Sequence, residues 1–236
     1  MSTPTSLPAA LLRHAAETPE DPWLFRPEGL DWRWHPFGEM ARRMELDAGV
    51  AASAEVPFRA EPAWVSLDLA RQAAGRGVVL RTADGSAMTW RAAELVAEGE
   101  AFGAELERAA GLPAAGREIV VWSGPPDDPE RRALLAWATL RGAALVLEPD
   151  PGALAATAAW ARPTVFQGTA GDLAALRQSV EEGSARRWFR RAPALPLRRL
   201  RAIQVVGPRG LSAPDEAFWR SRGVALIAAE RRSRGI

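Results

Sequence analysis

The chain has 236 residues, of which 47% are hydrophobic and 25% charged, and its formal net charge is +1. This length and composition suit one α/β domain, or a domain with a small appended piece. The near-neutral charge predicts no global attraction to nucleic acid or acidic membranes. The absence of cysteine excludes disulfides and thiolate metal sites, and His14 and His35 are the only histidines, so no metal site is expected.

The N-terminal sequence carries no recognisable targeting signal. Residues 1–8 lack a basic segment followed by an apolar one, which a secretory signal requires. No window approaches the ~18 uninterrupted apolar residues of a transmembrane helix. A cytoplasmic location is therefore the expectation.

The predicted elements before residue 111 form two similar units, each a helix, a hairpin and a second helix. In the first unit these are residues 11–17, strands 23–25 and 31–34, and residues 37–47. In the second they are residues 67–74, strands 77–81 and 88–90, and residues 91–110. Leu24 and Trp34 occupy the same places in the first unit as Leu80 and Trp90 in the second. A degenerate repeat and a chance similarity of supersecondary type both fit this pattern.

Beyond residue 116, apolar strands alternate with amphipathic helices. The strands are 117–122, 142–147, 163–166, 200–206 and 224–227, and the helices are 130–141, 170–182 and one that begins at Ser212. A strand, helix and strand of these lengths predict a crossover in a parallel sheet, with Trp122 and Trp137 buried in it. The expected fold is α/β, a mostly parallel sheet flanked by helices with an N-terminal helix–hairpin extension. The predicted domains are the extension at 1–62, the α/β domain at 63–228 and a basic tail at 229–236.

Three blocks of sequence together are similar to the adenylate-forming (AMP-binding) superfamily, especially its long-chain acyl-CoA synthetase branch. They are Gly85–Leu95, Gly116–Leu147, and Arg162–Gly168 followed by Leu200–Ser212, and they occur in the family's order. The resemblance implies an incomplete version of the acyl-CoA synthetase N-terminal domain. It also implies AMP-dependent ligase chemistry in fatty acid metabolism. No cofactor is expected for the chain alone, and ATP or AMP with Mg would serve only the split-enzyme alternative described below.

The departures from the family pattern bear on activity. In the family, a Ser/Thr/Gly-rich phosphate loop with a lysine lies between the second and third blocks. Here Leu147–Gly152 leads through one helix's length to Arg162, and all 30 basic residues of the chain are arginine. A phosphate cradle needs successive free backbone N–H groups and a cation, and arginine does not replace a compact ammonium. The family's C-terminal domain, with its catalytic lysine, also has no counterpart in this sequence. No catalytic residue is therefore assigned.

One turn is a candidate nucleotide site. The family's adenine-facing turn corresponds to Gly207, Pro208, Arg209 and Gly210, where proline removes a backbone donor and arginine adds bulk. An ordinary strand-to-helix turn explains the same residues. Acidic residues at 127, 128 and 130 look like paired carboxylates, but their place at a helix N-terminus favours a capping role.

The second candidate is an interaction site, where arginines and an aromatic residue cluster. Its residues are Arg186, Arg187, Trp188, Arg190 and Arg191, with further arginines at 198, 199 and 201. Such a cluster can bind an anionic surface, although a solvated linker is the commoner explanation.

We expect a catalytically silent relative of the acyl-CoA synthetases, a pseudoenzyme that binds no cofactor and serves in binding or assembly. Two alternatives stay open. One is a subunit of a split acid–thiol ligase, whose partner chain supplies the phosphate loop and which uses ATP and Mg. The other is an anion-binding module using the arginine cluster.

The missing segment should leave a strand edge near 163–166 and an apolar patch near 226–227. Unpaired edges and apolar patches drive association. We therefore expect self-association or a protein partner, such as an acidic carrier protein or a missing adenylation subunit. No nucleic-acid partner is expected.

Overall fold

The computed structural model describes residues 4–28, 31–49, 61–81, 87–112, 118–123, 129–148, 150–189, 197–207 and 210–228. The first half contains α1 (Leu7–Glu17), β1 (Pro22–Glu28), β2 (Asp31–Pro36), α2 (Phe37–Asp47), α3 (Pro62–Ala73), β3 (Val78–Arg81), β4 (Ala87–Trp90) and α4 (Ala92–Ala110). The second half contains β5 (Ile119–Ser123), α5 (Pro129–Arg141), β6 (Ala144–Glu148), η1 (Pro151–Ala153), α6 (Leu154–Ala161), β7 (Val165–Thr169), α7 (Ala170–Phe189), η2 (Leu197–Arg199), β8 (Ala202–Val206), α8 (Ala213–Arg220) and β9 (Ala225–Ala228).

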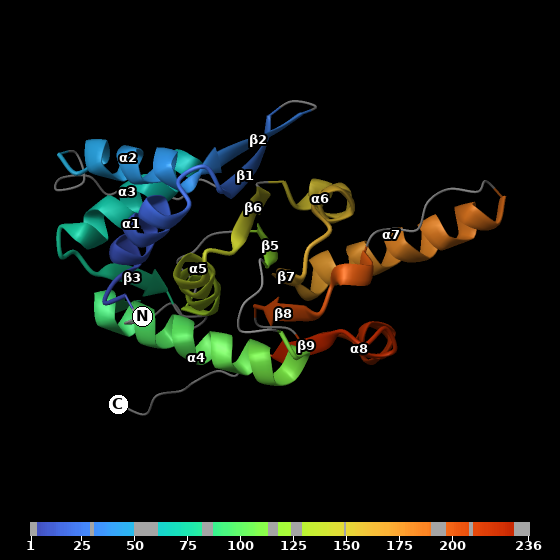
Figure 1. Cartoon of the computed structure of the whole chain (residues 1–236). Coiled ribbons are helices and arrows are strands. Elements are labelled where there is room, and N and C mark those ends of the chain that lie inside the picture. The colour runs from blue at the N-terminus through green and yellow to red at the C-terminus, as the bar shows by residue number, and fades with distance from the viewer. Residues whose placement is uncertain are drawn as a thin grey trace.

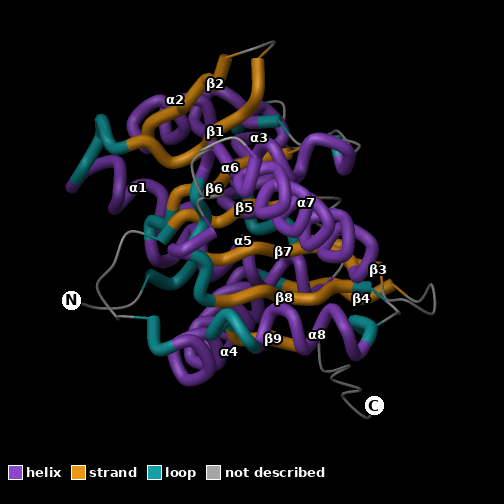
Figure 2. The backbone as a smooth tube through the Cα atoms, turned by 90° about the vertical axis from the view of Figure 1, so that its right-hand side faces the viewer, coloured by secondary structure: helices purple, strands orange, loops and turns teal. Residues whose placement is uncertain are grey.

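A seven-stranded sheet lies between two layers of helices (Figure 1). Its strand order is β2-β1-β6-β5-β7-β8-β9, and all neighbours run parallel except β1 and β2. Helices α1, α4 and α5 contribute to the core on one face, and α6, α7 and α8 to the core on the other (Figure 2). The predicted α/β class with a mostly parallel sheet is confirmed.

The N-terminal helix–hairpin segment belongs to this sheet. Ser6 caps α1 by accepting a hydrogen bond from the backbone N–H of Ala9, at 3.2 Å. Strand β1 then pairs with β6, with Leu24 beside Leu145, and β2 returns antiparallel to form one edge. Residues of α1, β1 and α2 share one apolar core with α5 and β5. The segment predicted as an extension is thus continuous with the main fold, and the boundaries at 62 and 228 stay predictions.

The second helix–hairpin–helix unit takes a different place. Its hairpin, β3 and β4, forms a separate two-stranded sheet, so the two units share their element order but not their environment. Helix α4 lies close against α5 because Gly99 and Gly103 leave room: a Cβ would come within 2.9 Å of the Ala136 Cβ at the first and 2.5 Å of the Trp137 ring at the second.

The central strands are buried on both faces, as parallel strands between helical layers must be. All five residues of β6 and of β8 are buried, and Trp122 and Trp137 are 1% and 4% exposed, as predicted. The expected strand edge near residues 163–166 is wrong, because β7 lies between β5 and β8. The sheet edges are β2 and β9. Nor is there an exposed apolar patch at 226–227, since Ile227 is 3% exposed and Leu226 is partly buried.

Candidate functional site

The topology singles out one place at the carboxyl ends of the parallel strands. The helix after β5 packs on one face of the sheet, whereas the helix after β7 packs on the other. Because β5 and β7 are neighbours, their diverging connections create a switch point, the usual location of ligand sites in open α/β sheets. The candidate site is therefore the carboxyl edge formed by β5, β6, β7 and β8.

The turn predicted to face adenine begins at this edge. Gly207 directly follows β8 and has a φ of +97°, a backbone conformation that strongly favours glycine. In register beside the last residue of β8 lies Thr169, the last residue of β7. Pro208 and Arg209 fall outside the described residues, so nucleotide binding by this turn stays a prediction.

The polar groups next to this turn are engaged with each other. The Asp172 carboxylate accepts hydrogen bonds from the backbone N–H and the hydroxyl of Thr169, at 2.7 and 2.8 Å. This pair closes the first turn of α7, where a carboxylate also complements the helix dipole. The arrangement caps a helix and offers no free carboxylate oxygen pair aimed at a ligand.

A second closed turn follows β6, where the family resemblance leads us to expect the phosphate loop to be missing. Glu148 is 2% exposed, and its carboxylate accepts hydrogen bonds from the Thr157 hydroxyl and from the backbone N–H of Asp150. The Asp150 side chain in turn accepts one from the backbone N–H of Gly152, at 2.8 Å. Backbone donors that a phosphate would need are therefore bound to carboxylates of the chain itself.

Sequence reasoning missed a polar bridge inside the sheet. The Gln167 amide of β7 donates to Gln204 of β8 at 2.7 Å, and Gln204 donates to the backbone carbonyl of Glu130 at 3.3 Å. Both glutamines are buried. Their bridge links the two strands to the first turn of α5, beside the switch point. The sequence signal that could have indicated this bridge is a glutamine at the third position of each of two mostly apolar strands.

A buried ion pair on the α5 side was missed as well. Arg132 is fully buried, pairs with Asp68 of α3, and lies over the Trp64 ring with its Cζ atom 5.7 Å from the ring centroid. Its Nε and Nη1 atoms have no hydrogen-bond partner among the described residues. Asp68 also accepts a hydrogen bond from Gln72 at 2.8 Å. This pair fixes α3 against α5.

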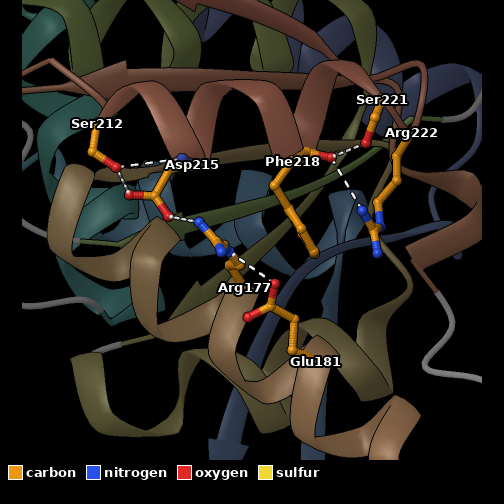
Figure 3. A network of polar contacts seen from close by, with 7 residues as sticks. All are labelled: Arg177, Glu181, Ser212, Asp215, Phe218, Ser221 and Arg222. Carbon is orange, nitrogen blue, oxygen red and sulfur yellow. Dashed lines mark hydrogen bonds and ion pairs between the residues drawn. The ribbon is translucent and has the colours of Figure 1, made fainter.

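The predicted arginine cluster lies where α7 ends. Residues 186–188 belong to this helix, which continues past the expected end at 182, while Arg190 and Arg191 lie outside the described residues. Upstream, Arg177 of α7 bonds Glu181 at 3.0 Å and Asp215 of α8 at 3.1 Å (Figure 3). The Phe218 ring lies between two guanidinium groups, those of Arg177 and Arg222. These contacts join α7 to α8; a role of the cluster in binding stays a prediction.

A small cavity of about 110 Å³ lies under the β1–β2 hairpin. Arginines 26, 33 and 43 line it, and each has a carboxylate partner within 4 Å, respectively Glu61, Glu28 and Glu39. Burial acts to raise the pKa of Glu39, but the hydrogen bond from His35 and the nearby positive charges outweigh it and lower this pKa. Each arginine in the described lining of the cavity therefore has a carboxylate partner.

The described part of the chain contains no group of three or more histidine, aspartate or glutamate residues placed to hold a metal ion. None of the described helices combines the length and the apolar character needed to cross a membrane.

The architecture matches that of several solved structures. CmiS6 is 15% identical and superposes with a TM-score of 0.62, over 97% of this chain and 72% of its own. The N-terminal domain of FACL13 from Mycobacterium tuberculosis is 9% identical, with a TM-score of 0.68 over 94% of this chain and 75% of its own. A fatty acyl-adenylate ligase from L. pneumophila, in complex with acyl adenylate and pyrophosphate, is 8% identical, with a TM-score of 0.65 over 94% and 54%.

The fold is that of the adenylate-forming enzymes. No protein-family model matches the sequence, and no curated protein matches it either. The likeness to the adenylate-forming fold extends over nearly all of this chain but omits a quarter or more of each solved chain above. The chain is thus a partial version of that fold, in agreement with the resemblance of the three sequence blocks.

Proposed function

We propose that this chain is a catalytically silent form of the adenylate-forming fold, which acts through binding or assembly. The connection from β6 to β7 carries the proposal. In place of a phosphate loop, it consists of a carboxylate-closed turn, η1 and α6.

Electrostatics at this turn oppose a nucleotide phosphate. Phosphate groups are held by free backbone N–H groups and cations in a helix-terminal or nest geometry. Here the N–H groups of Asp150 and Gly152 donate to carboxylates, and the Glu148 carboxylate is buried beside them. A triphosphate would meet like charge, and the chain has no lysine to offset it. Adenylyl transfer depends on stabilising the charge of these phosphates.

The test is ATP–pyrophosphate exchange on the purified chain with Mg-ATP and a panel of fatty acids. The expected result is no exchange above a buffer control, together with no heat of ATP binding in calorimetry. A full-length fatty acyl-adenylate ligase is the positive control. Exchange that is saturable in ATP, and that survives repurification of the chain, would refute the proposal.

Two observations favour a second candidate, the subunit of a split ligase. The Gly207 turn keeps its left-handed backbone at the carboxyl end of β8, and the chain spans only part of the solved ligases. On this alternative a partner chain supplies the phosphate loop, and ATP with Mg binds only to the complex. Exchange activity that requires a second purified chain would support it over the silent form.

A further inference from the structure

An aromatic surface lies where the β1–β2 hairpin meets α6. The rings of Trp32 and Trp160 stack with centroids 4.0 Å apart and an interplanar angle of 7°, and Phe25 meets Trp160 edge-on at 5.9 Å. Trp34 lies opposite Phe25 in the hairpin register, so it projects from the same face. Trp34 is 49% exposed and Trp160 is 45% exposed. A half-exposed Trp160 in a stack built from distant segments, with a half-exposed Trp34 on the same face of the hairpin, is typical of interaction surfaces.

This surface borders a free sheet edge. Among the described residues, β2 pairs with a strand on one side only, β1, and Figure 1 shows the hairpin projecting beyond the helices. The outer side of β2 thus has no described strand beside it, and strand addition at such an edge is a recognised route to association.

On the charged face of the same hairpin, like charges oppose each other across the two strands, although Arg26 also has a partner outside the hairpin in Glu61, at 3.6 Å. Asp31 lies directly opposite Glu28, and Arg33 directly opposite Arg26. Like charges in directly opposed positions destabilise a strand pair. Arg33 reaches Glu28 diagonally, but at 3.8 Å and with both side chains more than half exposed, so this ion pair is weak. A strand on the outer side of β2 would correct the mismatch if it placed an arginine beside Asp31 and an acid beside Arg33.

We propose that the occupant of this edge is a second copy of the chain, with the two β2 strands paired antiparallel about a two-fold axis. A two-fold axis makes any self-paired strand antiparallel. A register centred on Trp32 places Asp31 of each copy opposite Arg33 of the other, and Trp32 opposite Trp32. A register centred on Asp31 or Arg33 would oppose like charges, and one centred on Trp34 would leave Asp31 without a β2 residue opposite it. The register centred on Trp32 is the one that pairs both charges. In it, each Trp34 lies diagonal to Trp32 of the other copy, and the aromatic surfaces join.

This inference names the assembly partner of the proposed function and rests on it. The two can nevertheless fail separately, because self-association is measured without nucleotide. Dimers together with pyrophosphate exchange would refute only the silent role. Monomers without exchange would refute only the self-association.

The experiment uses the full chain in light scattering coupled to size exclusion, from about 1 to 100 µM. The wild type should reach twice the 25.4 kDa of one chain. Asp31→Arg alone and Arg33→Asp alone each place like charges opposite each other twice per dimer. Each should raise the dissociation constant of the dimer at least about tenfold. The double variant D31R/R33D restores both pairs and should dimerise again. A mixture of the two single variants should form a heterodimer. Circular dichroism verifies that each variant is folded.

The matched control is Arg220→Asp, the same charge change at a similarly exposed arginine on α8, far from β2. It should leave the dimer unchanged. A wild-type chain that stays monomeric at 100 µM overturns the proposal. So does a dimer that both single substitutions leave intact, or two monomeric single variants that do not associate on mixing, since neither outcome is compatible with paired β2 strands in this register.

Discussion

The buried pair Arg132–Asp68 gives the most demanding test of how this fold is held together. Arg132 is fully buried, whereas the Asp68 side chain is 14% exposed and keeps a second partner in Gln72. The two partners should therefore differ in what their removal costs. Asp68→Ala leaves a buried guanidinium without its counter-ion, which costs about 3–5 kcal/mol. For a chain of this size, that corresponds to a fall of roughly 6–20 °C in Tm.

Arg132→Met should cost far less. Methionine fills much of the arginine's space beside Trp64, and the remaining Asp68 carboxylate reaches water and keeps its hydrogen bond from Gln72. Removing one member of a buried ion pair is costly when the other stays buried and charged. Because the Asp68 side chain is 14% exposed and keeps its bond to Gln72, we expect a loss below about 2 kcal/mol.

The assay is urea unfolding followed by tryptophan fluorescence and circular dichroism. Asp68→Asn serves as the control, because its amide oxygen still accepts hydrogen bonds and should give an intermediate loss. The reasoning fails if Arg132→Met is at least as destabilising as Asp68→Ala, or if Asp68→Ala costs under 1 kcal/mol.

Two further substitutions test packing and ionisation. Gly99→Ala should destabilise the chain by about 1–3 kcal/mol despite the better helix propensity of alanine, because the new Cβ would lie 2.9 Å from the backbone nitrogen of Trp137. The control is Gly171→Ala in α7, where the nearest atom to the new Cβ is 3.7 Å away. This control should be neutral or stabilising in the same urea titration. Burial lowers the pKa of His14, against the opposing effect of its hydrogen bond to the Leu140 carbonyl, so the unfolded chain takes up a proton near pH 6.5 and the folded chain only at lower pH. Stability should therefore fall as the pH drops below about 6.5, and His14→Gln should flatten that dependence between pH 7 and 5.5; an unchanged slope would contradict this assignment.

Much of the secondary structure could be read from sequence because local signals agreed with tertiary packing. The helix predicted at 37–47 has those limits in the structure, and Ser212 caps α8 as expected. The buried strands were visible as apolar runs, which parallel strands between two helical layers require. Order along the chain, however, does not fix order within a sheet. After β6 the chain passes over β5 and forms β7 on its other side, between β5 and β8. Local patterns do not indicate this crossing, and for that reason the predicted edge at 163–166 was wrong.

The site was less accessible to prediction. Gly207 could be placed directly after a strand because an apolar run followed by glycine and proline is a local pattern, and its φ of +97° shows why glycine stands there. Nucleotide binding by the turn stays a prediction. The carboxylate-closed turn after β6 depends on Thr157, a residue nine positions from Glu148, and nothing in the spacing indicates that contact. Arg132 was hidden in the same way, because its partner Asp68 comes from a helix predicted independently.

The parallel pairing of β1 with β6 has a consequence for how the chain folds. Leu24 is placed beside Leu145, and this contact closes a very long loop of intervening chain. Closing such a loop costs entropy before any packing compensates for it, so non-local strand pairing slows folding. During synthesis, the N-terminal hairpin must wait with its apolar face uncovered until β6 leaves the ribosome. The hairpin is thus made well before the strand that completes its pairing, and the helices on either side of the hairpin are the segments available to shield it meanwhile.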